Sequence, residues 1–358
     1  MNTQSTTIWL RESFPWMGSH SGYEKVCDIL ATQKPTAYRT VYRPNKPLRG
    51  LARRSVSYFA RDIKGSDTYS SDSTYMELNA LCQSLWHRSS LIHVLYVERM
   101  LGLLAQWKSR FRYRLMATAH QPAGLWRLER HNPELLGSLD ALIVLSSREL
   151  SFFETCLPGR VHLILHGVDT KFFCPSPSPI RTEMPRFVFS GTWLRDLDTL
   201  SQVIETTLAR DPGIQFDLIV PANKRQQPQF YRIAHYDQVH WCGGLSDEQL
   251  RNVYRRAKAL VLPLLDCTAN NALLESIACG LPIISNDIGG MPDYTRDSFS
   301  TLLPPRDVNG FVEAILTLAE SQESQIKQGQ AARKFAETQL DWSAIANQTF
   351  NLYKKVNF

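Results

Sequence analysis

Short apolar segments alternate with longer segments of helical spacing along almost the whole chain, and few folds can accommodate that alternation. Segments rich in β-branched and aromatic residues are predicted as strands at Thr7–Leu10, Ile92–Val97, Leu115–Ala119, Ala141–Leu145, Val161–Leu165, Phe187–Ser190, Phe216–Val220, Val239–Cys242, Ala259–Pro263, Pro282–Ser285 and Thr301–Leu303. Strands that alternate with helices form parallel sheets covered by helices on both faces. The alternation therefore predicts an α/β protein built from two Rossmann-like domains.

A proline-rich segment separates the first group of predicted strands from the second. Prolines 175, 177, 179 and 185 fix φ and lack an amide donor, so residues 174–185 fit neither a helix nor a central strand. We expect a first domain at residues 1–173, a linker at 174–185, a second domain at 186–338 and a final helix at 339–358 that packs back across the domains. Two such domains would face a cleft, and their ligands would bind beyond the carboxyl ends of the strands.

The composition excludes several other classes of protein. Apolar residues make up 43% of the 358 residues and charged residues 21%, which is typical of a globular protein and not of a disordered, collagen-like or coiled-coil one. No apolar stretch approaches the roughly 20 residues of a membrane-spanning helix, and the first residues lack a secretory-signal pattern, so we expect a cytoplasmic protein. A net charge of +6 is too small to indicate nucleic-acid binding, and no nucleic-acid partner is expected.

The positive charge is concentrated in one segment near the N-terminus. Residues 31–64 hold nine basic residues and one acid, so the remainder of the chain is slightly acidic. Aromatic and aliphatic side chains are interleaved with these cations, and part of residues 39–64 fits an amphipathic helix on an anionic membrane. A solvated helix face or a phosphate-binding acceptor loop fits the same pattern. Arg49, Arg53 and Arg54 are the candidate contacts of this membrane or acceptor patch.

Residues 259–293 carry the most informative pattern. An apolar strand and a polar turn precede Asn270–Cys279, which has the composition of a helix that ends at Gly280. The free amides at the start of this helix form a site for an anion such as a diphosphate. Glu275 lies about one and a half turns further on, where its carboxylate can accept hydrogen bonds from ribose hydroxyls. Alternatively, Asn270 only caps the helix and the glutamate is a solvated surface residue.

Two segments of the first half hold further candidate site residues. The turn Gly18–Tyr23 follows the first strand and precedes a helix, so its backbone amides can approach a phosphate closely. The candidates in this turn are Gly18, His20 and Gly22. His120 stands at the end of a buried strand, where it is either a site residue or a structural histidine with satisfied hydrogen bonds.

The segment around Glu275 resembles the donor-binding motif of the retaining GT-B glycosyltransferases of family 4. In that family a Glu-x7-Glu pattern is followed by Ala-Cys-Gly-x-Pro and by a Gly-Gly turn. Glu275 corresponds to the second glutamate, Ala278–Pro282 to the segment after it, and Gly289 begins the turn. The first glutamate is absent, because Cys267 stands at its position with Asp266 beside it.

The resemblance continues in the expected order along the rest of the chain. Phe187–Leu200 is similar to the opening of the family's second domain, except that Thr192 stands where the family has an arginine that neutralises the leaving diphosphate. Arg195 and Lys224 are the candidates to supply that charge instead. Gly243 lies where the family holds the nucleobase against the backbone.

Two motifs are interpreted as structural. His166–Pro175 resembles the segment that closes the family's first domain. Asp196-Leu197-Asp198 mimics a metal-binding Asp-x-Asp motif, but its position predicts carboxylates at the start of a helix, where they interact favourably with the helix dipole. No catalytic metal is therefore expected.

The resemblance implies a retaining transfer of a sugar from a nucleotide-diphosphate donor to a hydroxyl of a glycan or a lipid-linked acceptor. It implies a front-face displacement in which His120 orients the sugar and Glu275 holds the ribose, with no cofactor and no metal. The implied donor-binding residues are Gly18, His20, Gly22, Arg195, Lys224, Gly243, Asp266, Asn270, Asn271 and Glu275. The implied partners are the nucleotide sugar, the acceptor and, through residues 39–64, the anionic inner face of a membrane.

Two other functions stay open at this point. Cys267 in place of the first glutamate, and Thr192 in place of the arginine, favour a catalytically silent GT-B protein that binds a nucleotide sugar or a partner as a sensor or scaffold. A nucleotide-sugar epimerase of the same fold fits less closely, because residues 269–290 follow the transferase pattern.

Overall fold

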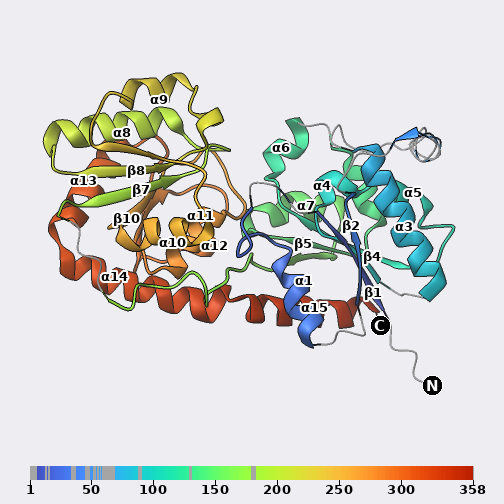
Figure 1. The fold of residues 1–358 in the computed structure, drawn as a ribbon. Helices are drawn as coiled ribbons and strands as arrows, with labels where there is room; N and C mark the ends of the chain where they lie inside the picture. Colours follow the sequence, from blue (N-terminus) through green and yellow to red (C-terminus); the bar gives the residue numbers. More distant parts are fainter. Residues whose placement is uncertain are drawn as a thin grey trace. The chain divides into compact units, whose positions relative to one another are not determined.

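The computed structural model describes residues 6–357, apart from residues 13, 15–16, 34–37, 45–48, 51–53, 55, 57, 59–68, 88–90, 129–130 and 179–182. The chain divides into two units (Figure 1). Unit 1 comprises residues 1–17, 23–166 and 342–358, and unit 2 comprises residues 18–22 and 167–341. Each unit is built around one six-stranded sheet.

The sheet of unit 1 has the strand order β2-β1-β3-β4-β5-β6, and all neighbouring strands are parallel. Its strands are β1 (Thr7–Arg11), β2 (Tyr38–Tyr42), β3 (Leu91–Val94), β4 (Arg114–Ala119), β5 (Ala141–Val144) and β6 (Val161–Leu163). Its helices include α1 (Lys25–Gln33), α3 (Ser71–His87), α4 (Val97–Met100), α5 (Leu103–Trp107), α6 (Ala123–Leu128), η2 (Pro133–Ser138), η3 (Ser147–Glu149), α7 (Leu150–Cys156) and α15 (Trp342–Asn357). Every residue of β3 and β5 is buried, as is typical of central parallel strands.

The sheet of unit 2 has the order β12-β11-β10-β7-β8-β9 and is also parallel throughout. Its strands are β7 (Arg186–Ser190), β8 (Gln215–Ile219), β9 (Val239–Cys242), β10 (Ala259–Leu262), β11 (Ile283–Asn286) and β12 (Ser300–Leu303). Its helices include α8 (Leu197–Arg210), η4 (Ala222–Lys224), α9 (Pro228–Ile233), α10 (Asp247–Arg256), α11 (Asn271–Ala278), α12 (Met291–Tyr294), α13 (Val308–Glu320), α14 (Gln322–Phe335) and η5 (Ala336–Leu340). Helices α8 and α13 lie side by side against this sheet (Figure 1).

The strand order of unit 2 reverses between β7 and β10. In parallel sheets of this kind the loops that follow the two strands at the reversal point diverge above the sheet edge and form the usual ligand site. The loop after β7 covers residues 191–196, and the loop after β10 covers residues 263–270. The strand order therefore indicates these two loops as the place where unit 2 would bind a ligand.

The predicted fold class is confirmed, and each predicted strand is present with its ends shifted by a few residues. The sequence analysis missed β2, which lies inside the basic segment. This strand is at the edge of its sheet, and Val41 is its one buried residue, so it lacks the alternation of buried and exposed side chains that predicts a strand. The strand occupies the first residues of the segment 39–64, part of which was predicted as an amphipathic helix. Residues 50, 54, 56 and 58 of that segment are helical, and their contact with a membrane stays a prediction.

The boundaries of the units differ from those expected. Residues 18–22, which the sequence analysis assigned to the first domain, and residues 167–185, where it ended that domain and placed the linker, group with unit 2. For residues 167–185 the reason lies in local contacts, because the backbone of Val168 bridges to that of Asp341 and the hydroxyl of Thr170 donates to the Asp341 carboxylate. The final helix belongs to unit 1, where it packs against α1 and β3.

Candidate functional site

The two loops at the reversal point of unit 2 are joined to each other. Arg195 forms an isolated bridge with Leu264, and the amide of Asp196 donates to the carbonyl of Pro263 over 3.0 Å. Asp196 also caps α8 by accepting from the amide of Thr199, as its position in the sequence predicted. These bonds fix the loop after β7 against the loop after β10.

Asn270 is the residue at which both loops meet the start of α11. Its extended backbone (φ −145°, ψ 114°) and its side chain cap the helix, since Oδ1 accepts from the amides of Ala272 and Leu273 at 3.0 and 3.4 Å. The same oxygen accepts from Nη2 of Arg195 at 3.2 Å. The predicted helix is confirmed, and a guanidinium lies beside its positive end.

Arg195 is held in this position by backbone carbonyls. Its Nε donates to the carbonyl of Ser190 over 3.0 Å and its Nη1 to the carbonyl of Trp193 over 2.9 Å. Gly191, with φ +86°, lets the guanidinium pass close to the backbone, since a Cβ there would lie 3.0 Å from Nη2. Burial lowers the pKa of Arg195 to about 10, so the group still carries its charge at neutral pH. The result is a preorganised positive charge at the loop edge.

Glu275 is a buried carboxyl on α11, not the solvated residue of the alternative interpretation. The residue is 4% exposed, and its two oxygens accept hydrogen bonds from the hydroxyl of Ser21 and, at 3.0 Å, from the hydroxyl of Tyr254. Burial raises the pKa of Glu275 to about 7, which these two hydrogen bonds oppose and the nearby charge of Asp247 reinforces. The carboxyl therefore changes its protonation state close to neutral pH.

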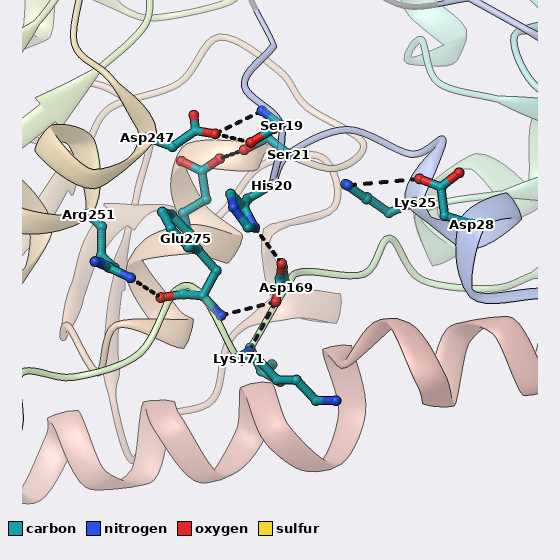
Figure 2. Close-up of polar contacts among 12 residues, drawn as sticks. Ser19, His20, Ser21, Lys25, Asp28, Asp169, Lys171, Asp247, Arg251 and Glu275 are labelled. Atoms are coloured by element: carbon teal, nitrogen blue, oxygen red, sulfur yellow. Dashed lines mark hydrogen bonds and ion pairs between the residues drawn. The ribbon is translucent and has the colours of Figure 1, made fainter. Parts of the chain in front are cut away.

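The Gly18–Gly22 loop is bound to two helices of unit 2 (Figure 2). The carboxylate of Asp247, at the start of α10, accepts from the amide of Ser19 at 2.8 Å and from its hydroxyl at 2.7 Å. The hydroxyl of Ser21 donates to Glu275 on α11. A Cβ on Gly18 would overlap the Asp247 carboxylate, so a larger residue there would displace that side chain. The loop is thus fixed to the start of α10 and to the middle of α11.

His20 completes a small pocket in the same place. The residues that line this pocket are His20, Ser21, Gly22, Gly167, Val168, Asn271, Leu274 and Glu275. His20 Nδ1 lies 2.7 Å from Oδ2 of Asp169 (Figure 2). The imidazole stacks on the ring of Phe172 with 3.6 Å between centroids. The sequence-predicted residues of the Gly18–Gly22 turn, Asn271 and Glu275 are therefore brought together by the fold.

Cys267 and Asp266 lie on the loop before α11, and they contact each other within this loop. Burial raises the pKa of the Cys267 thiol to about 12, so it is neutral where the resembling family has a carboxylate. Asp266 Oδ1 accepts from the amide of Cys267 at 2.7 Å. Gly289 has φ +50°, and a Cβ there would overlap the carbonyl of Cys267, so this glycine is required for the close approach of the two segments. Replacement of the missing glutamate by Asp266 stays a prediction.

Lys224 follows β8, and Gly243 follows β9. In the strand order these two strands lie on the side of β7 that faces away from β10. Lys224 is exposed at the end of η4. Its neighbour Arg225 lies against this edge instead, with Nε donating to the carbonyl of Val220 over 3.0 Å and the guanidinium 5.4 Å from the ring centre of Trp241. A Cβ on Gly243 would come within 2.7 Å of Nη2 of Arg225.

His120 belongs to unit 1, at the carboxyl end of β4. Its Nε2 donates to the carbonyl of Leu95 over 2.9 Å, and its ring stacks on that of Tyr96 with 4.4 Å between centroids. Burial lowers the pKa of His120 to about 3, and the neighbouring His166 acts in the same direction. His120 is therefore a neutral imidazole with the proton on Nε2.

The basic patch is only partly described. Arg49 and Arg54 are exposed, while Arg53 lies outside the described residues. Residue 54 is helical, and the helical residues Val56 and Tyr58 are buried and exposed, respectively. Within the described ranges no helix has the length and apolar character needed to cross a membrane. No group of three or more His, Cys, Asp or Glu side chains is placed to hold a metal ion in the same part of the chain.

The two parallel sheets and their reversal points define the GT-B class of fold, and solved structures of that class agree. Sucrose-phosphate synthase from Thermosynechococcus elongatus superposes with a TM-score of 0.73 at 19% identity, over 98% of this chain and 99% of that one. HepE from Anabaena, in complex with UDP and glucose, gives a TM-score of 0.69 at 15% identity over 98% and 99% of the two chains. At these identities the likeness shows the fold alone.

Sequence comparisons point to a family model and to curated relatives. Residues 184–321 match the family described as glycosyl transferases group 1. The MMP alpha-(1->4)-mannosyltransferase of Mycolicibacterium hassiacum is 26% identical over 64% of this chain and 56% of its own length. The D-inositol 3-phosphate glycosyltransferase of Corynebacterium glutamicum is 23% identical over 68% and 67%. The chain spans only 56–64% of the first three curated relatives that it matches.

Proposed function

We propose that this protein transfers a sugar from a nucleotide-diphosphate donor to a hydroxyl acceptor, with retention at the anomeric carbon. The observation that carries the proposal is the convergence of the α11 start, the Arg195 guanidinium and the Glu275 carboxyl at the reversal point of the second sheet. The positive end of a helix and a fixed cation bind a diphosphate, and a carboxylate binds ribose hydroxyls. The mannosyl- and inositol-phosphate glycosyltransferases among the relatives support this class of reaction.

The diphosphate is both the anchor of the donor and the leaving group. As the glycosidic bond breaks, negative charge grows on the leaving diphosphate, and groups already aimed at that position stabilise the transition state. Arg195 and the amide of Asn271 fill this role without reorganisation, because Asn270 and the carbonyls after β7 fix the guanidinium and the start of α11. No cofactor besides the nucleotide sugar is part of the proposal, and the HepE structures with UDP and UDP-glucose support a donor of this chemistry.

Glu275 is assigned to the ribose of the donor, and His120 is assigned to the sugar that is transferred. A carboxylate has lone pairs beyond the two bonds that Ser21 and Tyr254 make, so Glu275 can accept from the ribose as well. His120 orients the transferred sugar as a neutral imidazole, and the leaving phosphate helps to deprotonate the acceptor hydroxyl. The acceptor is a glycan or a lipid-linked hydroxyl, which residues 39–64 would approach at an anionic membrane surface.

The proposal is tested by donor binding. UDP-glucose, GDP-mannose and ADP-glucose are titrated by calorimetry into the protein, its Glu275→Ala variant and a Glu323→Ala control, which removes an exposed glutamate of α14. One donor should bind, and Glu275→Ala should weaken it roughly 10- to 100-fold, the range expected for lost hydrogen bonds to a charged group. The control should leave the affinity unchanged. Equal affinity for Glu275→Ala would overturn the assignment.

A catalytically silent binder is the second candidate, and the neutral buried thiol of Cys267 favours it. Such a protein would bind a nucleotide sugar without releasing the nucleoside diphosphate, with or without an acceptor. Donor turnover above background excludes this candidate. Conversion of the donor alone into an isomeric nucleotide sugar would instead indicate the epimerase.

A further inference from the structure

The contact between His20 and Asp169 brings together two sequence motifs that lie far apart. His20 comes from the glycine-rich turn after β1, and Asp169 from the segment that the sequence analysis interpreted as structural. A carboxylate only accepts hydrogen bonds, so the 2.7 Å contact places a proton on Nδ1 of the imidazole. The second carboxylate oxygen of Asp169 accepts from the amides of Lys171 and Phe172 at 3.2 and 3.0 Å, which fixes the carboxylate itself.

The imidazole plane is fixed as well. His20 stacks on Phe172 with 7° between the rings. On α10, Arg251 lies with its guanidinium carbon 4.3 Å from the ring centre of Phe172 and donates to the carbonyl of that residue over 3.2 Å. Figure 2 shows where His20, Asp169 and Arg251 lie. Asp169 and Phe172 thus hold the ring of His20 in one orientation.

The ring borders the pocket in which Asn271 and Glu275 also lie. With Nδ1 bonded to Asp169, the other nitrogen, Nε2, is the atom available to a ligand. The side chain of His20 is 33% exposed, which is enough for direct contact. The pocket is lined by Asn271, the first residue of α11, where the helix dipole favours an anion.

We propose that Asp169 is a positioning residue that holds His20 so that its imidazolium donates a hydrogen bond from Nε2 to the diphosphate of the donor. The carboxylate on one side and the phosphate oxygen on the other both stabilise the charged ring. Binding of the anionic donor therefore shifts the ring towards its protonated form. This inference rests on the proposed function, since it assigns a further contact to the same donor.

Several charged groups surround the ring and affect its protonation. Asp169 faces Nδ1, and Arg251 of α10 acts through Phe172. Asp247 and Glu275 hold the neighbouring serines of the same turn. Glu275 is the one of these whose own titration falls near neutral pH, so proton uptake is measured both in the native sequence and in a Glu275→Gln background.

The test is calorimetric titration of UDP-glucose, GDP-mannose and ADP-glucose at pH 8 in buffers of different ionisation enthalpy. These donors are diphosphate diesters that do not titrate near pH 8, so proton uptake reports on the protein. The wild type should take up protons as the donor binds. His20→Gln should abolish the uptake and weaken binding roughly tenfold, the expected value of one charge-assisted hydrogen bond.

Asp169→Asn isolates the positioning role, because the amide oxygen can still accept from Lys171 and Phe172. It should reduce the proton uptake, weaken donor binding and change the ¹⁵N chemical shifts of His20 away from those of a ring protonated on Nδ1. Exposed residues of the same types give the matched controls, Asp237→Asn and His235→Gln, which should change neither readout.

The outcomes separate the inference from the function on which it rests. If no donor binds, the proposed function and this inference both fail. Donor binding without proton uptake, or with unchanged affinity in His20→Gln, overturns the inference and leaves the proposed function standing. An Asp169→Asn variant that matches the wild type in uptake and in ¹⁵N shifts overturns the role of Asp169.

Discussion

The burial of Glu275 raises its pKa, and the raised pKa makes the stability of the protein depend on pH. Its pKa is raised from the ordinary 4.5 to about 7 because burial disfavours the carboxylate. The folded state then binds more protons than the unfolded state between these two values, so the free energy of unfolding falls as the pH rises from 4.5 towards 8. A shift of this size corresponds to about 3 kcal/mol. The contribution of Glu275 to the free energy of unfolding is therefore smallest at the pH values at which its carboxylate is ionised and can accept hydrogen bonds.

We predict that Glu275→Gln removes this fall in the free energy of unfolding at higher pH. The variant should gain stability relative to the wild type by about 3 kcal/mol between pH 4.5 and pH 8, because glutamine does not ionise. Urea unfolding at the two pH values measures the difference, and Glu323→Gln, at an exposed position, is the control. An identical pH dependence for the wild type and Glu275→Gln would contradict the burial of a titrating carboxyl.

Cys267 gives a second prediction at this scale. Its thiol is buried and its pKa is raised to about 12, so the reactive thiolate is almost absent at neutral pH. Cys82 is exposed on α3. Iodoacetamide should modify Cys82 in the folded protein and Cys267 only after unfolding, as read by peptide mass spectrometry. Modification of Cys267 under native conditions would show that the loop before α11 is open.

The individual site residues were predictable only where their neighbours in sequence carry the pattern. Asn270 and Glu275 belong to one strand-loop-helix segment, and their roles in the helix follow from it. Asp247 and Tyr254 were missed because their partners lie far away in the chain, 228 residues from Asp247 to Ser19. No local spacing encodes such a contact. The sequence offered one weak signal, the capping box that starts α10 beside Asp247.

At the scale of elements, the start of α11 is the part of the site with the clearest energetic basis. Asn270 satisfies two helix amides and also accepts from Arg195. Asn270→Ala should lower the free energy of unfolding by about 1–2 kcal/mol, the usual cost of a lost cap. Asn270→Asp keeps the cap and places a negative charge beside both the guanidinium and the helix dipole, so it should be neutral or stabilising.

Urea unfolding followed by circular dichroism measures both variants. Asn271→Ala, one residue further on, is the control for a change at the helix start that leaves the cap intact. Equal unfolding free energies for Asn270→Ala and the wild type would show that other groups satisfy these amides. The same experiment separates the cap from donor binding, since it is done without ligand.

The elements themselves were largely predictable, and β2 shows the limit. Central parallel strands are continuous apolar runs and stand out in the sequence. The edge strand β2 reads Tyr-Arg-Thr-Val-Tyr and has four of its five side chains at least partly exposed, so it is not distinguished from a basic loop. Its place is decided by backbone pairing with β1, which leaves no mark in the hydrophobic pattern.

At the scale of the whole molecule, the chain carries one strongly basic segment on an otherwise slightly acidic protein. If residues 39–64 meet an anionic membrane, charge reversal at the exposed Arg49 and Arg54 should strongly reduce cosedimentation with phosphatidylglycerol vesicles. Neutral phosphatidylcholine vesicles give the baseline. Reversal of Lys354 and Lys355 near the C-terminus controls for net charge alone. Vesicle binding that survives reversal at Arg49 and Arg54 would exclude this surface.

The division into two sheets was predictable from the alternation of strands and helices, while the grouping of residues 18–22 and 167–185 with unit 2 was not. That grouping depends on hydrogen bonds such as those of Ser19 and Thr170, whose partners are set by the folded chain. The fold class therefore follows from patterns repeated over the chain, and the exact composition of the site follows from single long-range contacts.

The most direct test of sugar transfer follows the anomeric configuration of the product. The donor that binds in the calorimetric panel is incubated with hydroxyl acceptors, glycans and lipid-linked sugars among them, and the reaction is followed by phosphorus and proton NMR. The account predicts release of the nucleoside diphosphate and a product with the anomeric coupling constant of the donor. Release with the opposite anomeric configuration, or no release with any acceptor from a donor that binds, would contradict it.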